Sequence, residues 1–217
     1  MPGVPEPEKP KLRGVLHQTA FFIAVVLAPI LIVSTDAGRA RAAAAVFAAS
    51  VVACFGASAL YHRVTWKPRA RLWLRRIDHA GVYFLIAGTY TPVALLVLQG
   101  AWRPVVLTVV WAGAIGATLL KFVWVAAPKW LAAAIGIALG WVAVVVLPQM
   151  IAHLPAVAVI LLVVGGLAYT AGAVVYARRR PDPIPAVFGY HELFHAFTIV
   201  GVACQYVAIA FFVVRAG

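Results

Sequence analysis

The sequence predicts an all-α integral membrane protein: a seven-transmembrane helix bundle with its N-terminus in the cytoplasm and its C-terminus outside. Three observations lead to this prediction. Hydrophobic residues make up 65% of the 217 residues and charged residues only 11%, whereas soluble domains are about half apolar and a quarter charged. Apolar runs long enough to cross a bilayer recur along the whole chain. Lys and Arg gather on one side of these runs, as they do in cytoplasmic loops.

Each predicted span is close to the roughly 20 residues that a helix needs to cross a bilayer, and Pro, Gly or charged residues separate the spans. The polar, proline-rich residues 1–13 are expected to form a disordered cytoplasmic tail, followed by one seven-transmembrane domain over residues 14–217. Because residues 1–10 contain no apolar core beside a cleavage site, we expect the first span to direct insertion. In chain order we expect spans over residues 15–33, 41–61, 77–98, 104–125, 130–147, 155–176 and 188–214.

Tryptophans and small residues fit these elements. Trp66, Trp73, Trp102 and Trp130 lie near span ends, where interfacial indoles are enriched. Glycines recur in the fifth and sixth spans and allow neighbouring helices to approach closely. These patterns support the helix bundle and carry no chemistry of their own.

Positive charge orients the predicted bundle. Fourteen of the 18 Lys and Arg residues lie on the side of the N-terminus, and four lie on the other side. Because Lys and Arg favour the cytoplasm, the N-terminus is predicted to be cytoplasmic, and an odd number of spans then puts the C-terminus outside. Topology therefore explains the net charge of +12, and we expect no nucleic-acid partner.

The motif His191-Glu192-Leu193-Phe194-His195 opens the seventh span. Histidines four apart on a helix share one face, about 6 Å apart along the axis. This is the HExxH spacing, which offers two imidazoles to a zinc ion. Its literal interpretation is a metalloprotease with Glu192 as general base, and the simpler alternative is a pair of packing histidines.

Four polar residues share one predicted depth. His62 ends the second span, Asp78 begins the third, and His191 and His195 begin the seventh. All four therefore lie within about two helical turns of the cytoplasmic face. Three imidazoles and one carboxylate, brought together from three helices, can form a zinc site with an open fourth position.

Each of these residues also has a simpler explanation. His62, beside Arg63, could be an interfacial loop residue. Asp78 could balance nearby arginines, although an acid inside a span is costly and is functional by default. Ser58 lies one turn deeper than His62 on the same face, but serines in spans often bond to their own backbone.

Other candidates are expected to lie apart from this group. His79 points about 100° away from Asp78 around the helix axis, so we expect it to pack against a neighbour or lipid headgroups. His17, near the start of the first span, has no partner in register. Cys54 and Cys204 lie in apolar segments and are interpreted as packing residues rather than a disulfide or metal ligands.

Four motifs form a recognisable set: Ser58-x-x-x-His62, Ile77-Asp78-His79-Ala80, the segment LIAGTYTP at residues 85–92 and the segment GYHELFH at residues 189–195. Together they resemble the bacterial hemolysin III proteins, which belong to the progestin and adipoQ receptor (PAQR) superfamily with the adiponectin receptors. The resemblance runs from about residue 17 to the C-terminus. It implies seven helices, a cytoplasmic N-terminus and a place in the bacterial plasma (inner) membrane.

The resemblance also implies a zinc ion near the cytoplasmic leaflet. By motif, its ligands carry over to His62, His191 and His195, with Ser58 and Asp78 beside the metal. The adiponectin receptors are associated with ceramidase-like amide hydrolysis, and hemolysin III proteins carry a historical cytolysin label and a link to membrane lipid homeostasis. The role of Glu192 stays open between supporting the zinc and pairing with the arginines at residues 178–180.

The leading functional prediction is a zinc-dependent hydrolase of lipid amides or esters, acting in membrane lipid homeostasis. Zn²⁺ held by the three histidines would activate a water. Asp78 would take the proton from that water as general base, and Ser58 would position the scissile carbonyl. The expected partner is a membrane lipid with its acyl chain in the helix bundle.

Three alternatives compete with the hydrolase. The same site could be structural, in a non-catalytic membrane-state sensor or receptor, although a structural zinc usually has four protein ligands. A pore-forming cytolysin is suggested by the family name alone and disagrees with seven apolar spans that carry few charges. An intramembrane metalloprotease is rejected because no acidic residue follows the 191–195 motif to complete its site.

Overall fold

A computed structural model of the protein describes residues 9–216. That part of the chain is helical throughout its regular structure and contains no strand. Seven of its helical segments are long and apolar enough to cross a membrane, which confirms the predicted fold class. The helices are α1 (Val15–Ser34), α2 (Arg39–Arg63), α3 (Pro68–Leu96), α4 (Trp102–Val123), α5 (Lys129–Gly140), α6 (Ala143–His153), α7 (Ala156–Arg178), α8 (Tyr190–Phe211) and the short 3-10 helix η1 (Val213–Arg215).

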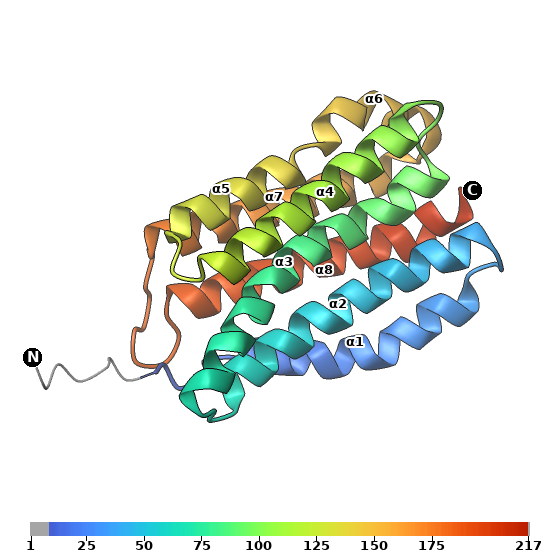
Figure 1. Cartoon of the computed structure of the whole chain (residues 1–217). Helices are drawn as coiled ribbons and strands as arrows, with labels where there is room; N and C mark the ends of the chain where they lie inside the picture. Colours follow the sequence, from blue (N-terminus) through green and yellow to red (C-terminus); the bar gives the residue numbers. More distant parts are fainter. Residues whose placement is uncertain (1–8, 217) are drawn as a thin grey trace, which may run out of the picture.

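The spans run side by side in one bundle, and the described chain starts at one end of the bundle and finishes at the other (Figure 1). Helix α8 contacts α1, α2, α3 and α7, so the motif at its start is within reach of several other helices. The side of the membrane on which each end lies stays a prediction from the placement of Lys and Arg.

Local sequence explains where helices begin at the end of the bundle that contains the start of α8. Gly14 precedes α1 with φ 80°, a left-handed conformation that glycine adopts readily. Pro68 is the first residue of α3, where its missing N–H removes no helical hydrogen bond. At the start of α8, the Glu192 carboxylate accepts a hydrogen bond from the Gly189 N–H at 2.9 Å, which satisfies a backbone donor that the helix leaves free.

Helix α3 begins nine residues earlier than the predicted span. Residues 68–76 are rich in Arg and mostly exposed or half-buried, so they fall below the hydropathy of a membrane segment while still forming a helix. The helical extension therefore projects beyond the apolar part of α3.

The predicted fifth span is not one continuous helix. It divides into α5 and α6 at Trp141 and Val142, and Tyr90 of α3 stabilises the break. The Tyr90 hydroxyl accepts a hydrogen bond from the Ala143 N–H at 2.7 Å and donates one to the Gly140 carbonyl. Because backbone polar groups within a bilayer need internal partners, this tyrosine makes the break tolerable inside a span.

Close packing of α2 on α3 sets the spacing of the residues at the end of the bundle. A Cβ atom added to Gly88 would lie 2.5 Å from the Ser50 Cβ, and one added to Gly81 would lie 3.3 Å from the Cys54 Cα. Small residues of this kind let membrane helices approach closely. The approach brings the end of α2 beside the start of the apolar part of α3.

Residues 1–8 of the predicted disordered tail lie outside the described residues. The rest of that segment lies against the loop that precedes α8. The backbone N–H groups of Lys11 and Leu12 donate to the carbonyl oxygens of Ala186 and Val187 at 3.0 and 3.1 Å. The start of α1 is thereby held beside the start of α8.

Candidate metal centre and cavity

Three histidines from α2 and α8 meet at one end of the bundle. His62 lies in the last turn of α2, and His191 and His195 lie in the first two turns of α8. One ring nitrogen from each lies within 4.8 Å of the others, and the Nε2 atoms of His62 and His191 are 3.2 Å apart. The structure thus brings together the three residues that the sequence predicted as metal ligands.

The geometry of this histidine cluster fits a metal ion. Imidazole nitrogens bound at 2.0–2.1 Å around a tetrahedral ion lie about 3.3 Å from each other, which matches the separation of His62 and His191. The Nδ1 atom of His195 is buried and, among the described residues, has no hydrogen-bond partner. Within the described part of the chain, the group consists of these three histidines, and three protein donors are typical of zinc sites that keep one position open.

Asp78 of α3 lies beside the histidine cluster. Its Oδ2 atom is 3.7 Å from the Nε2 of His62, and its side chain is only 11% exposed. The same His62 nitrogen lies close to both His191 and Asp78, so the carboxylate lies at the edge of the histidine cluster. This is the position that the sequence predicted for an acid beside the metal.

Ser58 lies one helical turn before His62 and is buried. Its hydroxyl oxygen is 2.8 Å from the Nδ1 of His17, and its side chain also interacts with the Asp78 carboxyl group. The expectation that His17 has no partner in register is wrong. The depth of His17 near the start of the first span could have placed it at this end of the bundle, but nothing in the sequence shows the rotation of α1 that turns it inward.

His17 also supports one of the candidate ligands. It is 3% exposed, and its ring stacks on that of His195 with centroids 3.6 Å apart and planes within 8°. Gly14 permits the close approach of α1 to this site, because a Cβ atom there would lie 2.5 Å from the His62 Cβ. Helix α1 therefore contributes a positioning residue that sequence reasoning missed.

Glu192 has a partner that the sequence did not indicate. Its side chain is fully buried, forms an ion pair with Arg13, and accepts the hydrogen bond from Gly189. The arginines at residues 178–180 are exposed and do not form this pair. Since its carboxylate is engaged by a cation and a backbone amide, Glu192 is poorly suited to be the general base of a metalloprotease.

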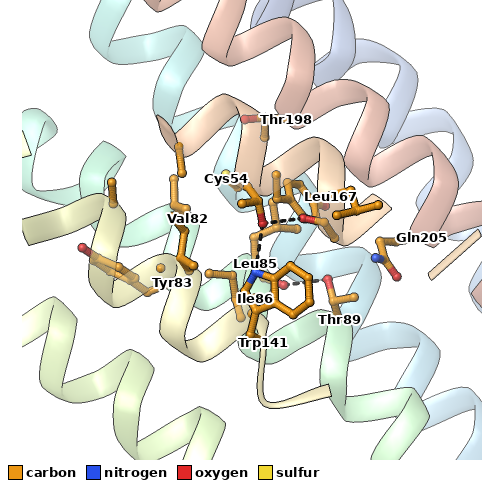
Figure 2. Close-up of a pocket in the computed structure, with 18 of the residues that line it drawn as sticks. Cys54, Val82, Tyr83, Leu85, Ile86, Thr89, Trp141, Leu167, Thr198 and Gln205 are labelled. Carbon is orange, nitrogen blue, oxygen red and sulfur yellow. Dashed lines mark hydrogen bonds between the residues drawn. The ribbon is translucent and has the colours of Figure 1, made fainter. Parts of the chain in front are cut away.

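A cavity of about 280 Å³ extends from the histidine cluster into the bundle. His17, Ser58, Asp78, His191 and His195 line it at the cluster, and most of its remaining wall is apolar. Figure 2 shows the wall farther along, where Ile86 of α3, Trp141 at the α5–α6 break and Leu167 of α7 surround the space. A polar reacting end and an apolar interior together suit a molecule with an acyl chain.

His79 and Cys54 also line this cavity. The sequence predicts that His79 packs against a neighbour or lipid headgroups, and its buried Nδ1 has no hydrogen-bond partner within residues 9–216. Cys54 is a buried free thiol, in agreement with its interpretation as a packing residue.

Comparison with known proteins gives a consistent result. A family model described as "Haemolysin-III related" matches residues 6–206. The chain is 30% identical over 170 residues to "Hemolysin-3 homolog" of Bacillus subtilis (strain 168), covering 78% of this chain and 76% of the relative. It is 27% identical over 204 residues to "Hemolysin-3" of Bacillus cereus, covering 93% of this chain and 90% of the relative.

Proposed function

Because the chain belongs to the haemolysin-III related family of integral membrane proteins, we propose that its histidine cluster and cavity form the site of a zinc-dependent hydrolase of lipid amides or esters. The protein is a multi-pass protein of the bacterial plasma membrane. Its substrates would therefore be membrane lipids, and its activity would contribute to membrane lipid homeostasis.

The observation that carries this proposal is the position of Asp78. A carboxylate 3.7 Å from a ligand nitrogen is not needed to complete a set of three histidines, and an acid inside a span is costly to the fold. A hydrolase needs a proton acceptor at that point, within reach of a water beside the histidines. A purely structural site gains much less from such a residue.

Zinc, when bound, supplies a Lewis acid that activates water and polarises a carbonyl group. Asp78 would accept the proton of the water as the water attacks the carbonyl carbon, and would pass that proton to the leaving amine or alcohol. The apolar wall would hold the acyl chain and keep bulk water away from the reacting carbonyl.

Ser58 would stabilise the negative charge that develops on the carbonyl oxygen. His17 prepares it for this role when the imidazole proton is on Nδ1, because His17 then donates to the Ser58 oxygen and leaves the hydroxyl proton free to point at the substrate. The stacking of His17 on His195 would keep both groups in place.

A second candidate function is a membrane-state sensor with a structural zinc. The observation in its favour is that this end is already held together by the His17–Ser58 contact between α1 and α2 and by the ion pair of Arg13, which precedes α1, with Glu192 of α8. An ion held by His62, His191 and His195 would add to these links and lock the helices together. In this case Asp78 would orient a ligand histidine rather than take part in a reaction.

The two functions are separated by a lipid hydrolysis assay. Purified protein in nanodiscs would be tested for release of free fatty acid from one amide-linked and one ester-linked lipid, in zinc-loaded and chelator-treated form. We expect release from the loaded protein, its loss on chelation and its recovery when zinc is returned. If the loaded protein releases no more than the stripped protein from either lipid, the hydrolase proposal is rejected and the sensor is favoured.

A further inference from the structure

Lys121 is a buried cation in the wall of the cavity. It lies in the last turn of α4, is 3% exposed, and lines the cavity together with Asp78 and His79 of α3. Within residues 9–216, no carboxylate lies within 4.0 Å of its ammonium group, and no hydrogen bond joins it to another side chain. An ammonium group that borders a largely apolar cavity without a carboxylate partner is unfavourably placed, so an anion bound in the cavity would stabilise it.

Two further groups of α3 lie near Lys121. Arg75 and His79 are both close enough to interact with it electrostatically. The buried Nδ1 of His79 has no hydrogen-bond partner among the described residues. An ammonium and an unpartnered ring nitrogen therefore both line the cavity, and the Arg75 guanidinium adds positive charge nearby.

Neighbouring cations at this end of the bundle are already engaged. The Nε of Arg76 donates to the Phe122 carbonyl at 3.1 Å, which joins α3 to α4. Lys129 donates to the Tyr190 hydroxyl and lies over the rings of Tyr176 and Tyr190. These contacts fix the walls of the cavity, and their positive charge makes an unpaired Lys121 still less favourable.

We propose that Lys121 and His79 bind the phosphate headgroup of an acyl lipid whose chain lies along the apolar wall of the cavity, with Arg75 adding positive charge near them. A lysine ammonium group binds phosphate oxygens well, and an imidazole N–H adds a further donor. The cavity of about 280 Å³ is near the lower end of the roughly 300–1,000 Å³ range of small-molecule sites, which suits a single-chain lipid.

The arrangement of α3 separates this headgroup site from the reacting residues. Asp78 and His79 are adjacent in sequence, so their side chains point about 100° apart around the helix axis. Asp78 lies beside His62, whereas His79 lines the cavity together with Lys121. The inference rests on the proposed function in taking the cavity as a lipid site, and it names the class of lipid.

The test is direct binding of single-chain lipids to the purified protein in a non-ionic detergent, with and without metal. The probes are lysophosphatidic acid, a monoacylglycerol with the same chain, and inorganic phosphate. We expect the wild-type protein to bind lysophosphatidic acid at least about 10-fold more tightly than the monoacylglycerol. Lys121→Gln should abolish this preference, Lys121→Arg should keep it, and Arg178→Gln, which removes an exposed cation at the same end of the bundle, should leave it unchanged.

Equal binding of the two lipids by the wild-type protein, or a preference that survives Lys121→Gln, would overturn the inference. Inorganic phosphate that binds as tightly as lysophosphatidic acid would instead assign the site to free phosphate. Should Lys121→Gln fail to fold, the Lys121→Arg variant and the comparison of probes on the wild-type protein still test whether the site prefers a lipid with a phosphate headgroup. Because binding is measured without turnover and in the metal-stripped protein as well, its outcome is independent of whether the hydrolase assay succeeds.

Discussion

The imidazole of His17 stacks on that of His195 at 3.6 Å between ring centroids, while its Nδ1 atom lies 2.8 Å from the Ser58 hydroxyl oxygen. One residue of α1 thus orients a candidate ligand on α8 and a candidate catalytic hydroxyl on α2. Groups that orient metal ligands contribute measurably to metal affinity, so the two contacts of His17 lead to separate predictions for stacking and for hydrogen bonding.

His17→Ala removes both contacts and should lower zinc affinity by about 10- to 100-fold. His17→Phe keeps an aromatic ring on His195 but loses the bond to Ser58, so it should retain most of the zinc affinity and lose lipid hydrolysis. Competition with a chromophoric chelator measures the affinity. Wild-type zinc affinity in His17→Ala would show that the stack does not support the ligand.

Replacement of any one of His62, His191 and His195 by Ala should lower zinc affinity by at least about 10²-fold, more than the loss of an orienting residue. His153→Ala is the matched control, because this exposed histidine bonds to the Gln149 carbonyl at the other end of the bundle. Metal content of the purified variants measures the effect. Full occupancy in His195→Ala would mean that the ligand set is misassigned.

Asp78→Asn should keep the fold and most of the bound zinc but lower lipid hydrolysis by about 10²-fold or more, the scale of a removed general base. Ser58→Ala should lose less activity, because a water can replace part of the function of a hydroxyl. Asp36→Asn, which changes an exposed acid outside the cavity, serves as the control in the fatty-acid release assay. Activity close to wild type in Asp78→Asn would remove Asp78 from the mechanism.

The destabilisation caused by breaking the Arg13–Glu192 ion pair should depend on which partner is replaced. Arg13→Gln leaves a fully buried carboxylate without its cation, and we expect it to lower the free energy of unfolding by about 3–5 kcal/mol. Glu192→Gln should be milder, because the amide oxygen can still accept from Gly189 and the partly exposed Arg13 can reach solvent. Denaturation in detergent compares the two variants, and equal destabilisation would argue against this asymmetry.

The predicted topology is tested by reporter fusions at the two ends of the chain. Fourteen of the 18 Lys and Arg residues lie on the side of the N-terminus, so a fluorescent reporter at the N-terminus should mature in the cytoplasm. A phosphatase fused after Gly217 should be active outside. A C-terminal fusion that reports a cytoplasmic location would contradict both the orientation and the assignment of the metal centre to the inner leaflet.

Depth along each helix could be predicted from the sequence. His62, Asp78, His191 and His195 lie near the ends of spans that turn back and forth across the bilayer, so their positions in the apolar runs place them at one level. A helix advances a constant distance per residue, and hydropathy marks where each span enters and leaves the membrane. This is why the histidine cluster was found from residues up to 133 positions apart in sequence.

What the sequence determined by itself is therefore the fold class, the number of spans and the level of the polar residues. Only the tertiary structure decided which way each helix turns: His17 toward Ser58, Arg13 toward Glu192, and Lys121 into the cavity. Burial in lipid gives no rotational preference to a helix that is apolar on all sides. Rotation is set by pairwise fit, such as Gly88 of α3 against Ser50 of α2, because packing and hydrogen bonding between helices drive their association in a bilayer.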